Sequence, residues 1–200
     1  MAFIISADEL KKTLPGYEPA RSDEFHQASA KLADQTYDRA IKERSENEVI
    51  LLSGGAASGK TEYLSVYLDS QEIIVLDGTL PSFEGAKIKI RKAIKRGKHV
   101  SVTAVMPEDF NIAFSAFLGR EREFPPEHFF RTHSSSRKTL LEIAEKLPDI
   151  DITIIDSEYD SDGGLHFTEI IFSDKTSMVE LLRQRQYTEA EIRNKIFHAT

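Results

Sequence analysis

Apolar residues occur along this chain in two kinds of pattern, and the two kinds alternate. Short uninterrupted apolar runs are typical of buried strands. They predict strands over residues 49–52, 73–76, 100–105 and 152–155. Between the runs, apolar residues recur at helical spacing. That spacing predicts helices over residues 22–44, 59–68 and 84–96, a helix that begins near Pro107, and a helix over residues 140–147 that starts from the three serines at 134–136.

A further strand, at an edge of the sheet, is predicted over residues 166–172, after a turn over residues 160–164. Two short helices follow, and their starts, Ser177-x-x-Glu180 and Thr188-x-x-Glu191, match the capping-box pattern. Strands that alternate with helices pair in parallel through right-handed crossovers. The sequence therefore predicts an α/β fold, a three-layer sandwich with a mainly parallel central sheet. No repeat or long linker divides residues 1–200, so we expect a single domain.

Composition narrows the class of protein. No apolar run reaches the ~18 residues that a membrane span needs, and Asp8 and Glu9 interrupt the apolar stretch at residues 1–5 before it reaches the length of a signal-peptide core. We therefore expect a cytoplasmic protein with no membrane contact. The absence of cysteine excludes disulfides, thiolate metal sites and a cysteine nucleophile. A net charge of −7 argues against a dedicated nucleic-acid binder.

The segment after the first predicted strand carries the clearest chemical signal. It satisfies the phosphate-binding loop (P-loop) pattern of glycine, any four residues, glycine, lysine, and serine or threonine. The matching residues are Gly54, Gly55, Ala56, Ala57, Ser58, Gly59, Lys60 and Thr61. Glycines let backbone N–H groups turn toward phosphate oxygens, and the next helix adds the positive end of its dipole. Lys60 would neutralise the β- and γ-phosphates of ATP, and the Thr61 hydroxyl would coordinate Mg²⁺.

Two predicted strands end in aspartate, at Asp77 and at Asp156. Ligands bind outside the carboxyl ends of parallel strands, so either side chain could hold Mg²⁺ or accept a proton from a substrate hydroxyl. Each could instead end its strand and cap the next turn. Asp77 is the stronger candidate for catalysis and for the metal, because its strand is the first after the P-loop and we expect the two strands to be neighbours.

Residues 120–137 contain a dense set of cationic side chains, Arg120, Arg122, Arg131 and Arg137, with His128 and His133 among them. Arginines can stabilise the charge of a transferred phosphoryl group. The alternative is that they pair with neighbouring glutamates on a solvated surface. The two histidines stand five positions apart, which favours packing in a loop over a metal site. A second basic stretch, residues 87–98, has no aromatic residue for base stacking and is expected to be a solvated helix face.

In this order the motifs resemble the zeta toxin family of P-loop kinases over roughly residues 10–160, which leaves residues 161–200 as an additional strand and helices. The residues that carry the resemblance are Leu14-Pro15-Gly16-Tyr17, His26 in the following helix, the strand and P-loop at 49–61, and residues 75–80, 97–107 and 119–133.

The resemblance implies a P-loop NTPase/kinase fold and a kinase that uses ATP and Mg²⁺. It implies UDP-N-acetylglucosamine as a candidate acceptor, an antitoxin protein as a candidate partner, and the phosphoryl-stabilising role for Arg120, Arg122 and Arg131. Family members usually have, soon after the P-loop helix, a strand that bears the catalytic base and then a substrate-binding insert. Here Asp77 follows Lys60 after only 17 positions. The resemblance therefore implies that the insert is missing, and that Asp77 is the base or that the base is absent.

The leading hypothesis is an ATP-dependent phosphotransferase that moves the γ-phosphate to a small hydroxyl-bearing acceptor, with a UDP-sugar as a candidate. One alternative is an NTPase that transfers the phosphoryl group to water. The other is a nucleotide-binding interaction protein that has lost catalysis.

Overall fold

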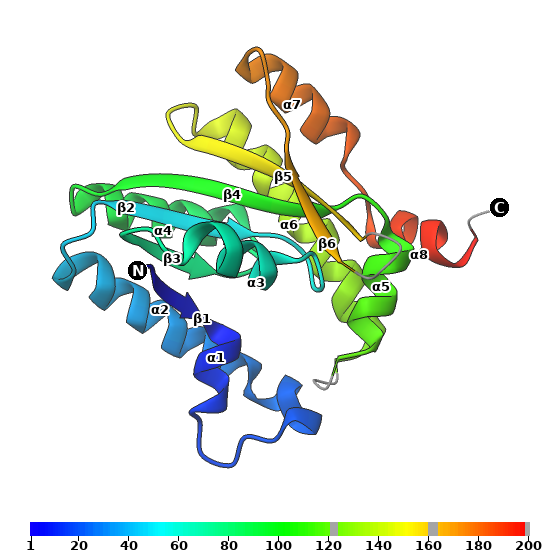
Figure 1. Cartoon of the computed structure of the whole chain (residues 1–200), viewed down its shortest axis with the longest axis horizontal. Helices are drawn as coiled ribbons and strands as arrows, with labels where there is room; N and C mark the ends of the chain where they lie inside the picture. The colour runs from blue at the N-terminus through cyan, green and yellow to red at the C-terminus, as the bar shows by residue number, and fades with distance from the viewer. Residues whose placement is uncertain (121–123, 160–163, 199–200) are drawn as a thin grey trace.

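A mostly parallel sheet forms the centre of the computed structural model, which describes residues 1–120, 124–159 and 164–198 (Figure 1). The described residues form six strands in the order β1-β3-β2-β4-β5-β6. The strands are β1 (Phe3–Ser6), β2 (Glu48–Ser53), β3 (Ile73–Asp77), β4 (His99–Pro107), β5 (Asp151–Tyr159) and β6 (Leu165–Glu169). Neighbours from β1 to β5 pair in parallel, and β6 pairs antiparallel with β5. The predicted α/β architecture is confirmed.

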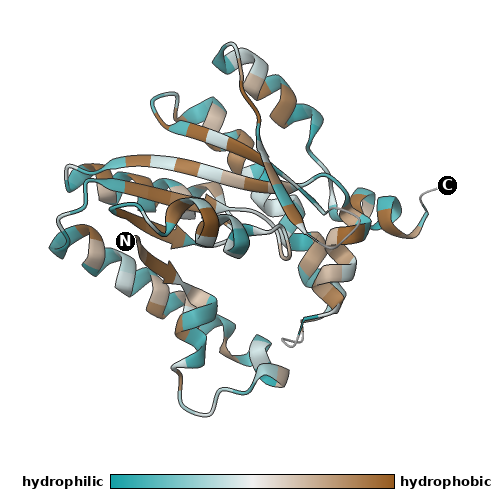
Figure 2. Cartoon of the chain, viewed as in Figure 1, coloured by the Kyte–Doolittle hydropathy of each residue, from teal (hydrophilic) through white to brown (hydrophobic). Residues whose placement is uncertain are grey.

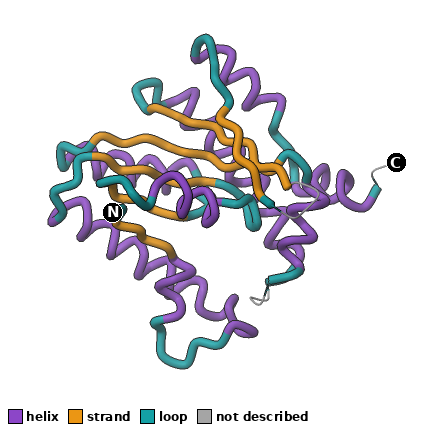
Figure 3. Tube along the Cα trace, in the orientation of Figure 1, coloured by secondary structure: helices purple, strands orange, loops and turns teal. Residues whose placement is uncertain are grey.

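Helices cover both faces of the sheet (Figure 3). The helical elements are α1 (Ala7–Lys12), the 3-10 helix η1 (Pro19–Phe25), α2 (His26–Glu43), α3 (Lys60–Tyr63), the π-helical turn η2 (Leu64–Leu68), α4 (Phe83–Lys95), α5 (Phe110–Leu118), α6 (Pro126–Lys146), α7 (Lys175–Gln184) and α8 (Glu189–Phe197). Alternate residues of β2 point to opposite faces, as strand geometry requires. Val49 and Leu51 join the core formed with α2, α4, α6 and α7, whereas Leu52 joins the core under η2. The strands β2 and β3 are correspondingly apolar along most of their length (Figure 2).

The strand β1 is an element that the sequence pattern did not predict. It is four residues long and lies at the edge of the sheet, where Ser6 pairs with Asp77 of β3. An apolar run this short gives a weak signal, because a strand is told from other short apolar segments chiefly by its length and flanking turns. Its position matters because it brings α1 to the same edge of the sheet as the carboxyl end of β3.

The helix α6 begins earlier than predicted. Pro126 occupies its first turn, where proline's missing N–H has no intrahelical partner to lose. The serines at 134–136 lie inside the helix, so the predicted start there was wrong. The hydroxyls of Ser135 and Ser136 donate to the carbonyls of Thr132 and His133, and these bonds inside the helix replace the expected capping role. His128 and His133 therefore lie on a helix and not in a loop.

Three other predictions concern the two capping boxes and the position of Asp156. The capping box at Thr188 and Glu191 is present. The one predicted at Ser177 is wrong, because Asp174 caps α7 by accepting from the Ser177 N–H. Asp156 does not end its strand: it lies within β5, and Arg185 of the segment after α7 forms an ion pair with it.

The basic stretch at residues 87–98 lies mainly on α4 and pairs with acids of α2. Lys89 lies 2.9 Å from Asp34, and Lys92 lies 2.6 Å from Asp38. These contacts agree with a solvated helix face. Within the described ranges, no helix is both long and apolar enough to cross a membrane.

Replacement of Ile154 by alanine should lower the free energy of unfolding by about 2–5 kcal/mol, because Ile154 is fully buried at the centre of β5 and its loss leaves a cavity. Urea denaturation measures the change. The matched control is Ile171→Ala, at a position 80% exposed, which should alter stability by less than about 0.5 kcal/mol. Equal effects of the two substitutions would contradict the described core.

Candidate functional site

The P-loop lies between β2 and α3, which is the strand-to-helix context that the motif requires. Its backbone is locally unusual. Gly59 has a φ of 84°, and Ala57 has a φ of 58°, a left-handed conformation that is uncommon for a residue with a side chain. Such backbone persists only where surrounding contacts impose it, and it concentrates at functional sites.

Hydrogen bonds from two other elements fix the loop. The N–H of Ala56 donates to the Thr132 hydroxyl at 3.0 Å, and its carbonyl lies 2.8 Å from Nε2 of His133. The Ser157 hydroxyl of β5 donates to the carbonyl of Ser58 at 2.9 Å. The loop therefore takes its shape from α6 and β5 as well as from its own glycines.

His133 is fully buried beneath the loop and is neutral. Burial lowers its pKa well below the usual value, and the Arg137 guanidinium lowers it further. The Ala56 carbonyl can only accept, so Nε2 carries the proton and Nδ1 accepts from Nη1 of Arg137 at 3.3 Å. The ring also explains why residue 55 is a glycine, because a Cβ at that position would lie 2.3 Å from the His133 ring.

The side chain of Lys60 folds over the loop. Its ammonium donates to the carbonyls of Gly54 and Gly55 at 2.9 and 3.0 Å. Loss of solvent lowers the pKa of Lys60. The carboxylate of Asp77 has the largest effect in the opposite direction, and Asp8 has a smaller one. This ammonium is therefore held where phosphates would enter the loop, and Asp77 is the acid with the largest effect on its pKa.

A cavity of about 480 Å³, which we call the P-loop cavity, brings most of the predicted site residues together. Those that line it are Ala56, Ala57, Ser58, Lys60, Thr61, Asp77, Arg120 and Arg131. Arg122 lies outside the described residues. Arg137 lines a different cavity.

Asp77 ends β3 beside the base of the P-loop. It pairs in register with Leu52 of β2, and the N–H of Gly78 donates to the Leu52 carbonyl at 3.1 Å. The expectation that these two strands are neighbours is confirmed.

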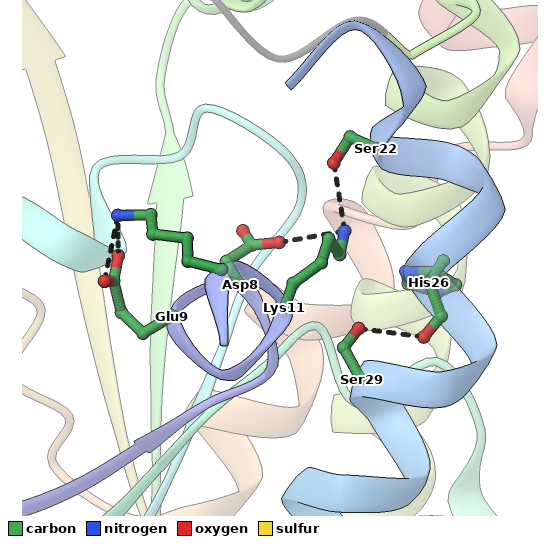
Figure 4. A network of polar contacts seen from close by, with 7 residues as sticks. Asp8, Glu9, Lys11, Ser22, His26 and Ser29 are labelled. Carbon is green, nitrogen blue, oxygen red and sulfur yellow. Dashed lines mark hydrogen bonds and ion pairs between the residues drawn. The ribbon is translucent and has the colours of Figure 1, made fainter. Parts of the chain in front are cut away.

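Asp8, which was not predicted as a site residue, is another carboxylate that lines the P-loop cavity. Asp8 lies in the first turn of α1, directly after β1. Its carboxylate is 3.4 Å from Nζ of Lys11, a side chain with no exposed surface, which also donates to the Ser22 hydroxyl at 3.2 Å (Figure 4). The Asp8 side chain itself is 46% exposed, so it is anchored and still accessible. The sequence does show an acid, Asp8, soon after the apolar stretch at residues 1–5. That pattern indicates the site only once β1 is known to lie beside β3.

Aromatic and imidazole rings form another part of the wall. The ring of His128 stacks on Phe124 with centroids 4.4 Å apart, and its Nδ1 lies 3.3 Å from Arg131. The His26 ring lies 6.1 Å from that of His128. Burial, aided by the charge of Arg131, lowers the pKa of His128 to about 4, and burial also lowers the pKa of His26. Both rings are therefore neutral at pH 7.

Magnesium fits the donor chemistry at the loop. Thr61 and Asp77 bring a hydroxyl and a carboxylate to one cavity, and Mg²⁺ takes oxygen ligands. No group of three or more acidic or histidine side chains in the described ranges could hold a metal by itself. A magnesium ion here would depend on substrate phosphates and water for its other ligands, as is usual for this ion.

Together these features define an α/β protein that carries a P-loop after the strand β2. No protein-family model and no curated protein sequence matches the chain. Among solved structures, the chain is similar to the AvrRxo1-ORF1:AvrRxo1-ORF2 complex with sulphate ions, with 13% identity and a TM-score of 0.52 over 82% of this chain and 74% of that one. The native complex gives 12% identity and a TM-score of 0.51 over 86% and 84%.

A structure from the PezAT chromosomal toxin-antitoxin system of Streptococcus pneumoniae is also similar, with 15% identity and a TM-score of 0.41 over 89% of this chain and 95% of that one. At such identities the likeness to the AvrRxo1 complexes concerns the fold alone, and it agrees with the predicted α/β architecture.

Acidification from pH 7 toward pH 4 should destabilise the protein. The folded-state pKa values of His128 and His133 lie below the unfolded value of about 6.5. The unfolded chain therefore binds more protons in this window, and stability falls as the pH falls. Urea denaturation at several pH values measures this, and His128→Gln should flatten the dependence. The control, His99→Gln, alters an exposed histidine and should not. A dependence that His128→Gln leaves unchanged would contradict the assignment.

Proposed function

We propose that this protein is an ATP-dependent phosphotransferase that transfers the γ-phosphate to a hydroxyl of a small acceptor, with UDP-N-acetylglucosamine and other UDP-sugars as the first candidates. The observation that carries the proposal is the composition of one cavity. Five residues of the P-loop, the carboxylates of Asp8 and Asp77, and two arginines all line it. A third acid of the lining, Asp34, is paired with Lys89. Nucleotide binding alone would not require the second carboxylate at this cavity.

The P-loop side of the cavity would hold ATP. Backbone N–H groups of the P-loop other than those of Ala56 and Ser58, which are bonded within the protein, would cradle the phosphates. Lys60 would leave the carbonyls of Gly54 and Gly55 to bind the β- and γ-phosphates. Thr61 and Asp77 would hold Mg²⁺, which supplies charge neutralisation at the phosphate oxygens when bound. Asp77 suits this role because it is the acid with the largest influence on Lys60.

Asp8 is the better candidate for the proton acceptor. It lies one strand farther from the P-loop than Asp77, and it is anchored by Lys11 and exposed to the cavity. An acceptor hydroxyl beside Asp8 would lose its proton to the carboxylate as its oxygen forms a bond to the γ-phosphorus, and the bond from that phosphorus to the bridging oxygen of ADP would break. This assignment replaces Asp77 as the base and leaves Asp77 to the metal.

Arg120 and Arg131 support the transfer step. Both line the cavity, and both are close enough to other site groups to lower a neighbouring pKa: Arg120 lowers that of Lys60, and Arg131 that of His128. Arginines in such positions stabilise the negative charge of the transferred phosphoryl group.

Incubation with ATP, Mg²⁺ and a pool of UDP-sugars, followed by mass spectrometry, tests the function. Gain of one phosphoryl mass on an acceptor supports the phosphotransferase. Release of inorganic phosphate without such a product supports the alternative of an NTPase. Nucleotide binding without either product supports a binding protein, and both of these results would overturn the proposal.

A protein partner is part of the proposal. The similar AvrRxo1 structures are complexes of two gene products. The similar PezAT structure belongs to a toxin-antitoxin system. These likenesses support an antitoxin as the class of partner for this chain.

Replacement of Lys60 by alanine should weaken ATP binding, because the loop loses its mobile cation and keeps its backbone cradle. Isothermal titration calorimetry with Mg²⁺ measures the affinity. Lys42→Ala, in an exposed part of α2, is the control and should bind ATP as the parent does. Unchanged affinity in Lys60→Ala would mean that the P-loop does not hold the nucleotide.

Asn substitutions separate the two carboxylates. Asp8→Asn should reduce turnover by a factor of about 10² to 10⁴ with nearly unchanged ATP affinity, because a general base is lost. Asp77→Asn should weaken the Mg²⁺ dependence of ATP binding, and excess Mg²⁺ should partly restore activity. Steady-state kinetics over a range of Mg²⁺ concentrations distinguishes them, with the exposed Asp149→Asn as control. If Asp8→Asn kept parental turnover, another group would have to accept the proton.

A further inference from the structure

A second cavity, of about 900 Å³, opens at the carboxyl ends of β4 and β5. We call it the α8 cavity, because residues of α8 line it together with Pro107, Ser157, Arg137 and the start of α5. No residue of the P-loop lines it. The larger of the two cavities is therefore separate from the proposed phosphotransfer site, although the two share the same edge of the sheet.

Arg137 is the unusual group of this cavity. It is only 3% exposed, and its guanidinium lies over the Phe110 ring, 4.8 Å from the centroid. Nη1 donates to His133, whereas Nε is buried without a hydrogen-bond partner. In the described part of the chain no carboxylate forms an ion pair with it.

A buried cation without a carboxylate is energetically unfavourable, because the loss of hydration is only partly offset by neutral partners. Burial, aided by the charge of Arg185, lowers the pKa of Arg137 to about 10. The acid that influences Arg137, Asp156, already forms an ion pair with Arg185. Among the described residues, Arg137 therefore has no carboxylate of its own.

Other lining groups show what the cavity would accept. Lys195 of α8 lies 4.8 Å from the centroid of the Tyr187 ring, and both residues line the cavity. The N-terminus of α5 adds the positive end of a helix dipole, and Asp109 caps it by accepting from the Asn111 N–H. Glu158 and Glu108 are the other acids of the lining, and the influence of Glu108 falls on Arg185. The set around Arg137 favours a negatively charged group beside aromatic rings.

We propose that the α8 cavity is a second ligand site, which binds a small molecule through a carboxylate or phosphate group on Arg137, and that it can be occupied while the P-loop holds a nucleotide. The ligand's anion would accept hydrogen bonds from the guanidinium and supply the missing charge. Arg137 also donates to His133, and His133 donates to the Ala56 carbonyl. Two hydrogen bonds would therefore connect the arginine that binds the ligand to the P-loop.

Titration of the Lys60→Ala protein with malonate and, separately, with inorganic phosphate tests the site, because that variant has a weakened P-loop. The readout is the Nε–H resonance of Arg137 in ¹⁵N NMR spectra. A saturable shift with malonate identifies a carboxylate site, and one with phosphate identifies a phosphate site. Sodium chloride at equal ionic strength should produce no saturable shift. Absence of a shift with both probes would overturn the proposal.

Two variants identify the residues. Arg137→Gln should abolish the thermal stabilisation that the effective probe confers, whereas Arg183→Gln, at an arginine that pairs with Glu145 outside the cavity, should retain it. If Arg137→Gln does not fold, Lys195→Ala keeps the test decisive: it should weaken the probe's affinity several-fold, and unchanged affinity would contradict the site.

A competition experiment separates this site from the nucleotide site. Saturation of the parent protein with ADP and Mg²⁺ should leave the response of Arg137 to the probe in place. Loss of the response would mean that the cavity belongs to the nucleotide site, and the proposal of a separate site would be wrong. The titration of Lys60→Ala requires no kinase activity, so its result stands whether or not the proposed function is correct.

Discussion

The two hydrogen bonds of Ala56 with α6 are the constraint on which the site depends. Consecutive residues of one helix, Thr132 and His133, bind the N–H and the carbonyl of a single loop residue. That helix is fixed in turn by fully buried core residues such as Phe129 and Ile143. The shape of the P-loop is therefore inherited from the hydrophobic core, and a ligand would meet a cradle that is largely formed before it arrives.

Much of the fold could be predicted from the sequence, because apolar runs and helical periods report burial locally. The P-loop, and the position of Asp77 on a strand next to it, could be predicted for the same reason, because each depends on elements that are adjacent in the chain. Asp8 could not be found in this way: its role depends on which strand lies beside β3, and a four-residue edge strand carries little pattern. The start of α6 was missed because three serines resemble a cap in sequence, whereas the preceding proline decides the start.

Two buried cations have different surroundings and, on our account, different tasks. Lys11 is compensated within the protein by Asp8, Ser22 and the face of the Phe124 ring, which suits a group that holds a carboxylate in place. Arg137 has a neutral imidazole and an aromatic ring as partners. A cation with neutral partners is one whose electrostatic energy depends on what enters the adjacent cavity.

The position of β1 has a consequence for the order in which the chain assembles. Phe3 pairs with Ile74, so β1 is synthesised before β3, the strand that it joins. The pairing of β2 with β3 needs only the segment between them. Because closure of a long loop precedes any gain from the contact it allows, β2 and β3 can pair while the segment that carries Asp8 is still undocked. The bonds of Ala56 with Thr132 and His133 form later still, because α6 follows β3 in the chain. During synthesis, the strands on both sides of the site would therefore be present before the P-loop takes its final shape.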